Sequence, residues 1–225
     1  MHSAKIVFFF ALAHAATSSA SFAATGTALH VALSPWTESK TRTTQHDELR
    51  RFVLGAAAPG THLTLWDGWS LRVLGDATVP SLRYDNAAAR SQNREIARLL
   101  LALKTWAASA TLREIGLAGS STLRIPEILQ EIGNSAATGQ RAIVLVGSPA
   151  YRSPAEPAFD MGVDARYPSD GHLAVGLRDS VFGLAEKAGR LDRASVHWCY
   201  SDQSVWANEL HRHSVTRFWT LFVQG

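Results

Sequence analysis

Apolar runs of strand length alternate along this chain with apolar residues at helical spacing. The runs over 28–33 and 142–146 are bounded by turn-forming residues, which is typical of strands buried in a sheet. The segment 92–106 carries an isoleucine and three leucines at three- and four-residue spacing, which predicts a helix with one buried face. The pattern therefore predicts a domain in which strands and helices alternate.

Shorter signals predict the remaining elements. Asp67-Gly68 between two short runs predicts a tight hairpin over 62–74. Pro, Asp, Gly and Ser are frequent over 148–173, which predicts irregular structure there. The other predicted elements are helices that begin at Thr44 and that cover 126–133, 180–191 and 204–218, and strands over 196–200 and 220–223. This order predicts an α/β domain with a mostly parallel sheet and one antiparallel edge strand.

The first twenty-four residues have the layout of a secretory signal peptide. Lys5 precedes the apolar run 6–13, and small residues lead to a predicted cleavage point near Ala23 or Ala24. The run is shorter than the ~20 residues that a membrane-spanning helix needs. We therefore predict cleavage after 1–24 and a single domain over 25–225, periplasmic or secreted, with no membrane span.

Composition narrows the possible partners. The 225 residues are 46% hydrophobic and 18% charged, which is ordinary for a globular domain, and the formal net charge is +3. The arginines are scattered along the sequence instead of forming one basic stripe, so no nucleic-acid partner is predicted. Cys199 is the only cysteine, which excludes an internal disulfide.

The order of elements, with a hairpin after the first helix, resembles the von Willebrand factor type A (VWA) family. In that family, an Asp-x-Ser-x-Ser loop after the first strand holds a divalent cation, together with a threonine and an aspartate from two further loops. The matching positions of the first loop here are Ser34, Trp36 and Glu38. Thr122 matches the threonine, and Gly147-Ser148-Pro149 stands where the family has Thr-Asp-Gly. The resemblance implies a three-layer α/β/α, Rossmann-like fold with a degenerate metal-ion-dependent adhesion site.

These loops offer few ligands for a hard cation. Divalent cations prefer several oxygen ligands, usually with at least one carboxylate. Hydroxyl groups come from Ser34, Thr122 and Ser148, and Glu38 is the only nearby acid. No metal and no cofactor are therefore predicted, and the alternative is a Mg²⁺, Mn²⁺ or Ca²⁺ site completed by Glu38 or Asp170.

A binding surface does not require the metal. Ligands of open α/β sheets bind at the carboxyl ends of the strands, where the strand order reverses. The resemblance places that point between strands 28–33 and 142–146. Exposed aromatic residues beside arginines are typical of protein interfaces, and Tyr167 lies in the long loop that follows. The candidate binding residues are Ser34, Trp36, Glu38, Thr122, Ser148, Tyr151, Arg152, Asp170 and His172.

Two further groups of residues could carry chemistry. Cys199 and His197 lie two apart on a predicted strand and hence on one face, as a nucleophile and its base would, with Asp202 or His172 as a third group. A buried, inert strand cysteine is the simpler interpretation. His211 and His213 are also two apart, but on a helix they point in different directions, so we interpret them as part of a solvated face and not as a metal pair.

The leading hypothesis is a non-catalytic, exported module that binds another envelope or extracellular protein. The alternatives are an exported hydrolase that uses Cys199 and His197, and a divalent-metal-dependent adhesion domain. Members of the family close with a helix, whereas the last predicted element here is the strand 220–223. One sheet face is therefore expected to be uncovered, because the chain is truncated or because a partner covers it.

Overall fold

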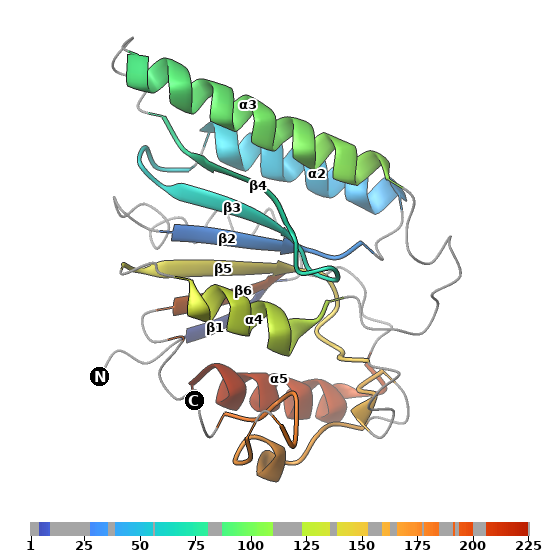
Figure 1. The fold of residues 1–225 in the computed structure, drawn as a ribbon. Helices are drawn as coiled ribbons and strands as arrows, with labels where there is room; N and C mark the ends of the chain where they lie inside the picture. The colour runs from blue at the N-terminus through green and yellow to red at the C-terminus, as the bar shows by residue number, and fades with distance from the viewer. Residues whose placement is uncertain are drawn as a thin grey trace.

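A computed structural model gives the structure of the protein (Figure 1). It describes residues 5–9, 28–35, 39–55, 57–80, 87–109, 123–135, 139–152, 159–162, 166–176, 178–184, 191, 194–199 and 206–224.

Within the described residues, six strands form one sheet in the order β1-β6-β5-β2-β3-β4. The strands are β1 (Lys5–Phe9), β2 (Ala28–Leu33), β3 (His62–Asp67), β4 (Val73–Thr78), β5 (Arg141–Val146) and β6 (Ala194–Cys199). All neighbouring strands run parallel except β3 and β4, which pair antiparallel at one edge. The predicted α/β class, with a mostly parallel sheet and one antiparallel edge strand, is confirmed.

Helices accompany the sheet at both ends of the strand order (Figure 1). They are α2 (Ser39–Gly55), α3 (Ala87–Ala108), α4 (Ile125–Asn134), α5 (Glu209–Gln224) and the short 3-10 turn η3 (Asp170–His172). α2 and α3 lie side by side near β4, whereas α4 and α5 lie toward β6 and β1. None of the helices described combines the length and the apolar character that crossing a membrane requires.

Alternate residues of the central strands enter two separate cores, because successive side chains of a strand point to opposite faces. We call these the α3 face and the α5 face. On the α3 face, Leu29, Val31 and Leu33 of β2 pack with α2 and α3. On the α5 face, Ala32 of β2 and Trp198 of β6 pack with α4 and α5.

Helix α3 covers the α3 face as its sequence pattern predicts. Its inward residues, Ile96, Leu99, Leu103 and Trp106, are all buried. A Cβ atom at Gly75 of β4 would stand 3.5 Å from the Leu99 Cα atom, an ordinary van der Waals distance, so the helix lies directly on this strand. The prediction of a helix over 92–106 is confirmed, with longer ends.

Arg42 of α2 anchors the end of α3. The residue is 1% exposed, and its guanidinium donates to the Trp106 carbonyl oxygen at 3.0 Å and to the Ser109 Oγ at 3.1 Å. It also donates to the Ser109 carbonyl and lies over the Trp106 ring, 5.7 Å from the centroid. A cation at the carboxyl end of a helix satisfies its last carbonyl groups and complements the helix dipole.

The predicted strand over 220–223 is wrong, because α5 continues to Gln224. Val215, Phe218, Trp219, Phe222 and Val223 are all buried, and their three- and four-residue spacing places them on one side of the helix. Burial of this side outweighs the β-propensity of the individual residues. The expectation of an uncovered sheet face is also wrong, since α5 packs there.

The predicted hairpin is present, but the prediction of a two-residue turn is wrong. β3 ends at Asp67 and β4 begins at Val73. Asp67 Oδ1 accepts the backbone N–H groups of Trp69 and Ser70 at 2.9 and 2.8 Å, and Leu71 takes the left-handed conformation with φ 59°. Gly68 lacks the positive φ that a two-residue hairpin turn requires, and its N–H instead donates to the Leu33 carbonyl oxygen at 2.9 Å.

Two other predicted boundaries differ. α2 begins at Ser39 and not at Thr44. Residues 180–184 form turns and not the start of a helix, and 185–190 lie outside the described residues. Phe182 lies within these turns. Its ring is fully buried against Phe218 of α5, although the chain is exposed a few residues before it.

β1 comes from the segment predicted to be a signal peptide. Lys5–Phe9 pairs in parallel with Ser195–Cys199 at the edge of the sheet. The cleavage point near Ala23 or Ala24 lies outside the described residues, so cleavage remains a prediction. Removal of the segment would leave β6 as the edge strand of the sheet.

Candidate functional site

The strand order reverses between β2 and β5, the position expected for a binding site. The chain leaves β2 toward β3 on one side and leaves β5 toward β6 on the other. Backbone hydrogen bonds join the carboxyl ends of these strands: the Ser34 N–H donates to the Val146 carbonyl oxygen at 2.9 Å, and the Gly147 N–H to that of Cys199 at 3.0 Å. The strand ends therefore form one continuous rim.

Leu123 fills the space above this rim. A side chain added at Gly68 would overlap the Leu123 Cδ2 atom. A Cβ atom added at Gly147 would lie 3.3 Å from Leu123 and 2.7 Å from the Ser34 Cβ atom. Leu123 is completely buried. An apolar side chain thus fills the space between Gly68 and Gly147 at the strand reversal.

The described loop residues at the rim have structural contacts of their own. Ser34 is 1% exposed, so its side chain is buried in the rim. Ser148 Oγ accepts the Ala150 N–H at 3.2 Å, which closes a local turn. The part of the chain that is described contains no cluster of three His, Cys, Asp or Glu residues suited to a metal ion. Trp36, Glu38 and Thr122 lie outside the described residues.

The segment that follows β5 turns from the rim toward α5. Tyr151 is buried, and its ring packs edge-on against Phe182 at a centroid distance of 5.0 Å. The Trp219 Nε1–H donates to the Pro149 carbonyl oxygen at 2.9 Å. Tyr151 is therefore part of the core and not the exposed contact residue that the sequence suggested.

An ion pair shapes the next part of the segment. Arg152 Nε donates to Asp160 Oδ1 at 2.9 Å, and the same carboxylate oxygen accepts the Gly162 N–H at 2.8 Å. The Met161 N–H donates to the Tyr151 carbonyl oxygen at 2.9 Å. These contacts hold the residues around 152 and 160 against each other in a closed loop.

A second ion pair ties the segment to α5. Arg217 donates to both carboxylate oxygens of Asp170, at 2.8 and 2.6 Å. The hydrogen bond from Arg217 lowers the pKa of Asp170, and the pair is exposed. His172 packs edge-on against Phe159 at 4.4 Å between centroids. The short turn η3 is thus fixed on the outside of α5.

The structure therefore separates the predicted binding residues into two groups. Ser34 and Ser148 lie at the rim, whereas Asp170 and His172 lie beside α5. Edge-to-face contacts among the rings of Tyr151, Phe182, Phe159 and His172 connect the two places. Tyr167 is 46% exposed near η3. The surface of the second group is the one that offers an aromatic ring and charges to a partner.

Cys199 and His197 share the α3 face of β6, as predicted. Burial, with a smaller effect of the Glu48 charge, raises the pKa of the Cys199 thiol to about 12. Burial lowers the pKa of His197 to about 4, and its Nε2 lies 3.2 Å from Ser195 Oγ. A thiol in this setting is protonated at neutral pH and is a poor nucleophile. Asp202 lies outside the described residues.

His30 is a buried polar residue that the sequence analysis missed. It is 5% exposed on the α5 face of β2, and its Nδ1 accepts the Trp66 Nε1–H at 3.3 Å. Burial, followed by the charges of Arg141 and His62, lowers the pKa of His30 to about 4. The lone histidine inside the apolar run 28–33 was the available signal.

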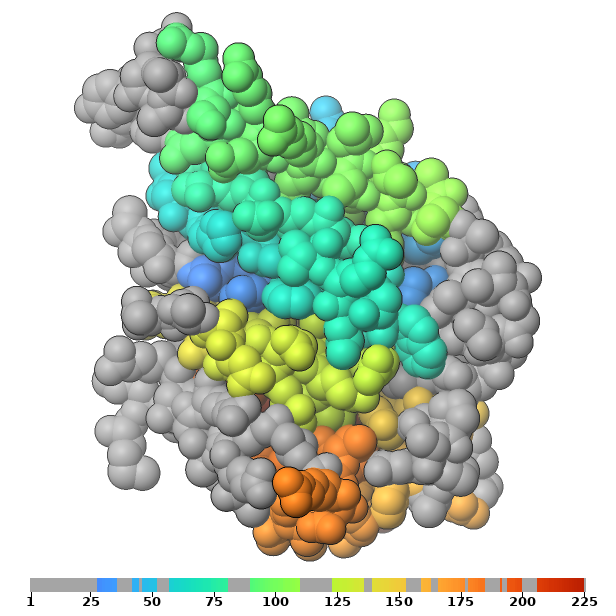
Figure 2. All heavy atoms as spheres, in the orientation of Figure 1, coloured from blue at the N-terminus to red at the C-terminus, as the bar shows by residue number. Residues whose placement is uncertain are grey.

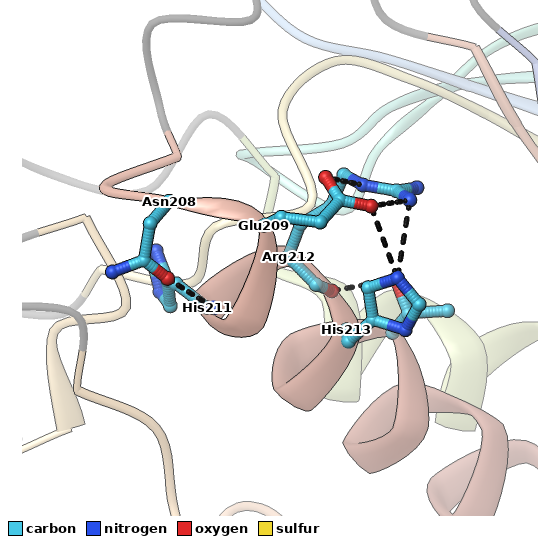
Figure 3. A network of polar contacts seen from close by, with 6 residues as sticks. Asn208, Glu209, His211, Arg212 and His213 are labelled. Carbon is cyan, nitrogen blue, oxygen red and sulfur yellow. Dashed lines mark hydrogen bonds and ion pairs between the residues drawn. The ribbon is translucent and has the colours of Figure 1, made fainter.

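His211 and His213 point in different directions at the start of α5, as predicted (Figure 3). The Ala207 N–H donates to His211 Nδ1 at 3.2 Å, and the His211 N–H donates to Asn208 Oδ1 at 2.8 Å. The second bond is that of an N-cap asparagine to the third residue of the helix, and the first satisfies the N–H group of the residue before the cap. The prediction of a solvated face is wrong for His211, which is 3% exposed.

His213 instead belongs to an exposed ion-pair network with Glu209 and Arg212 (Figure 3). The hydrogen bond from Arg212 is the main cause that lowers the pKa of Glu209 to about 2. Glu209 and Arg212 lie on the first turn of α5, where the Glu209 carboxylate complements the helix dipole. The network therefore stabilises the start of α5, and His211 and His213 have different hydrogen-bond partners.

Comparison of the chain with models of known protein families, with curated proteins and with solved structures gave no match.

Proposed function

We propose that this chain is an exported, VWA-like module that binds another envelope or extracellular protein and performs no catalysis. In this proposal the domain has three layers, α/β/α, and works without a metal or cofactor. The strand order β4-β3-β2-β5-β6, with its reversal between β2 and β5, supports the VWA-like arrangement. The contact surface extends from the rim at Ser148 to η3.

The observation that carries the proposal is the anchored segment between β5 and β6. Ion pairs at Arg152 and Asp170 and the buried ring of Phe182 hold it in place. It nevertheless keeps Tyr167 exposed beside the charges of Asp170 and Arg217. Residues that ion pairs and packing already hold lose little entropy on binding, and aromatic residues and arginines dominate binding energy at interfaces.

A photo-crosslinking residue at Tyr167 tests this proposal. Val73 on β4 is the matched control, because both side chains are 46% exposed. Illumination in intact cells should give a discrete protein adduct from position 167 and none from position 73. The adduct should weaken in Arg217→Ala. Equal adducts from both positions, or none from position 167, would refute a contact surface at η3.

The metal-dependent alternative has its own test. A cation at a hundred times its dissociation constant adds about 2.7 kcal/mol to the stability of the native state. Since Leu123 seals the rim, millimolar Mg²⁺, Mn²⁺ or Ca²⁺ should leave the thermal unfolding midpoint unchanged. A rise of several degrees that is lost in Glu38→Ala would favour an adhesion domain over the proposed metal-free module.

A further inference from the structure

A row of cations lies on the outer side of α3. Arg90, Arg94 and Arg98 are four residues apart, and all three are exposed. Residues at this spacing lie one above the other on a helix, about 6 Å apart along its axis. Lys104, about 1.7 turns after Arg98, is also exposed. The expectation that the arginines form no stripe is therefore wrong for this helix.

Little within the described chain offsets this charge. α3 carries four cations and one acid, the half-buried Glu95. Arg94, Arg98 and Lys104 form no hydrogen bond or ion pair to any residue that the structure describes. In the space-filling view, α3 (green) forms the upper margin of the molecule with its outer side open (Figure 2). Arg94, Arg98 and Lys104 are therefore available to an external partner.

We propose that the outer side of α3 binds the surface of an anionic lipid bilayer. The helix forms a convex ridge about 20 Å long between Arg90 and Lys104, and such a ridge can meet the phosphates of a flat surface along its whole length. Leu101 lies within the row and is 63% exposed. An apolar side chain among cations suits the boundary between headgroups and acyl chains better than the aqueous surface of an acidic protein.

Binding of this kind is peripheral and depends on salt. Each Arg or Lys near an anionic membrane contributes roughly a factor of five to the partition coefficient. Loss of two of the four cations should therefore weaken binding roughly 25-fold. High salt shortens the screening length from about 10 Å to about 3 Å and should abolish most of the binding. This inference does not rest on the protein-binding proposal, because α3 lies far along the sheet order from α5.

The test is sedimentation of the full chain with vesicles of phosphatidylcholine that contain about 30% phosphatidylglycerol. Arg94→Gln/Arg98→Gln should lose roughly 25-fold in partitioning. The control Arg166→Gln/Arg178→Gln removes the same charge from exposed arginines between β5 and β6 and should change partitioning less than about twofold. Equal losses in the two variants, or equal binding to pure phosphatidylcholine vesicles, would overturn the proposal.

A polarity-sensitive dye shows which side of the protein meets the lipid. Cys199 is the only cysteine and is buried, so a thiol-reactive dye labels Leu101→Cys selectively. Its emission should shift to the blue with anionic vesicles, whereas the same dye on Leu210→Cys of α5, a position that is 75% exposed, should not shift. A shift at position 210 alone, or binding to a DNA duplex without any shift at 101, would contradict the lipid assignment.

Discussion

The two faces of the sheet are covered in different ways. A pair of long helices covers the α3 face, and its core is largely aliphatic. On the α5 face, two shorter helices and an irregular segment cover the sheet together, and the core there contains Trp198, Phe182 and Trp219. Regular helices can bury a face with aliphatic side chains that recur at helical spacing. An irregular cover needs large rings and specific polar contacts to hold its shape.

The largest loss of stability is expected from a substitution at Trp219, on the α5 face. Trp219→Ala should cost about 3–5 kcal/mol of unfolding free energy, because it leaves a cavity and removes the donor to the Pro149 carbonyl. Leu99→Ala, on the α3 face, should cost about 2–5 kcal/mol. Urea unfolding measures both values. Limited proteolysis should then cut the 148–184 segment faster in the tryptophan variant alone, and equal cutting in both would contradict the different roles of the two faces.

Arg42 tests whether the α3 face also depends on a polar contact. Arg42→Met should cost about 2–3 kcal/mol, since it leaves the last carbonyl groups of α3 without their buried donor. Hydrogen exchange of the last turn of α3 should accelerate. Arg50→Met, at an exposed position of the same helix, is the control and should stay within about 0.5 kcal/mol of the parent. A small effect of Arg42→Met would mean that packing alone holds α2 on α3.

A buried histidine lies on a strand of each face, His30 on β2 and His197 on β6, and both should respond to acid. The pKa of His30 and of His197 is about 4 in the folded protein and about 6.5 in the unfolded chain. Below pH 6.5 the unfolded chain therefore binds more protons, and stability should fall as the pH drops from 6.5 to 4. Each histidine contributes at most about 1.4 kcal/mol per pH unit.

Urea unfolding across this pH range measures the slope. His30→Leu and His197→Leu should each remove the contribution of one histidine to this slope. The stability of each variant should therefore depend less on pH than that of the parent. His213→Gln, on the exposed side of α5, is the control and should keep the parent slope. If the control loses as much slope as the buried variants, the acid sensitivity has another origin.

The smallest effect is expected at the exposed ion pair of the α5 face. Asp170→Asn should leave the urea midpoint within error of the parent, because solvent screens exposed pairs. The crosslink from Tyr167 should nevertheless weaken, since η3 loses its attachment to Arg217. A large loss of stability in Asp170→Asn would show that this pair holds the fold and does not merely position a surface.

The sequence pattern predicted the regular parts of the molecule better than the irregular ones. Strands β2 and β5 and helix α3 follow from local periodicity, because each buries one continuous set of side chains. The end of α5 was mistaken for a strand, since short apolar runs fit both periods until the packing partner is known. Gly68 was assigned to a turn, whereas its actual role depends on Leu123, fifty-five positions later.

The candidate site was predictable only in part. The position of the strand reversal between β2 and β5 followed from the resemblance. The burial of Tyr151 did not, because it depends on the ring of Phe182 and thus on a contact between two irregular segments. The cation row of α3 was readable from the four-residue spacing of Arg90, Arg94 and Arg98. The net charge of the whole chain does not reveal this row, because the row belongs to one side of a single helix.

The pairing of β1 with β6 has a consequence for the order of events during synthesis. Ile6 pairs with Val196, which the ribosome adds about 190 residues later. At the usual rates of synthesis this interval lasts roughly 10–40 s. Throughout it, the amino-terminal apolar run has no strand to pair with and is open to any targeting factor. Incorporation of β1 into the sheet is therefore a late event, and under the proposed export a targeting factor would meet this segment first.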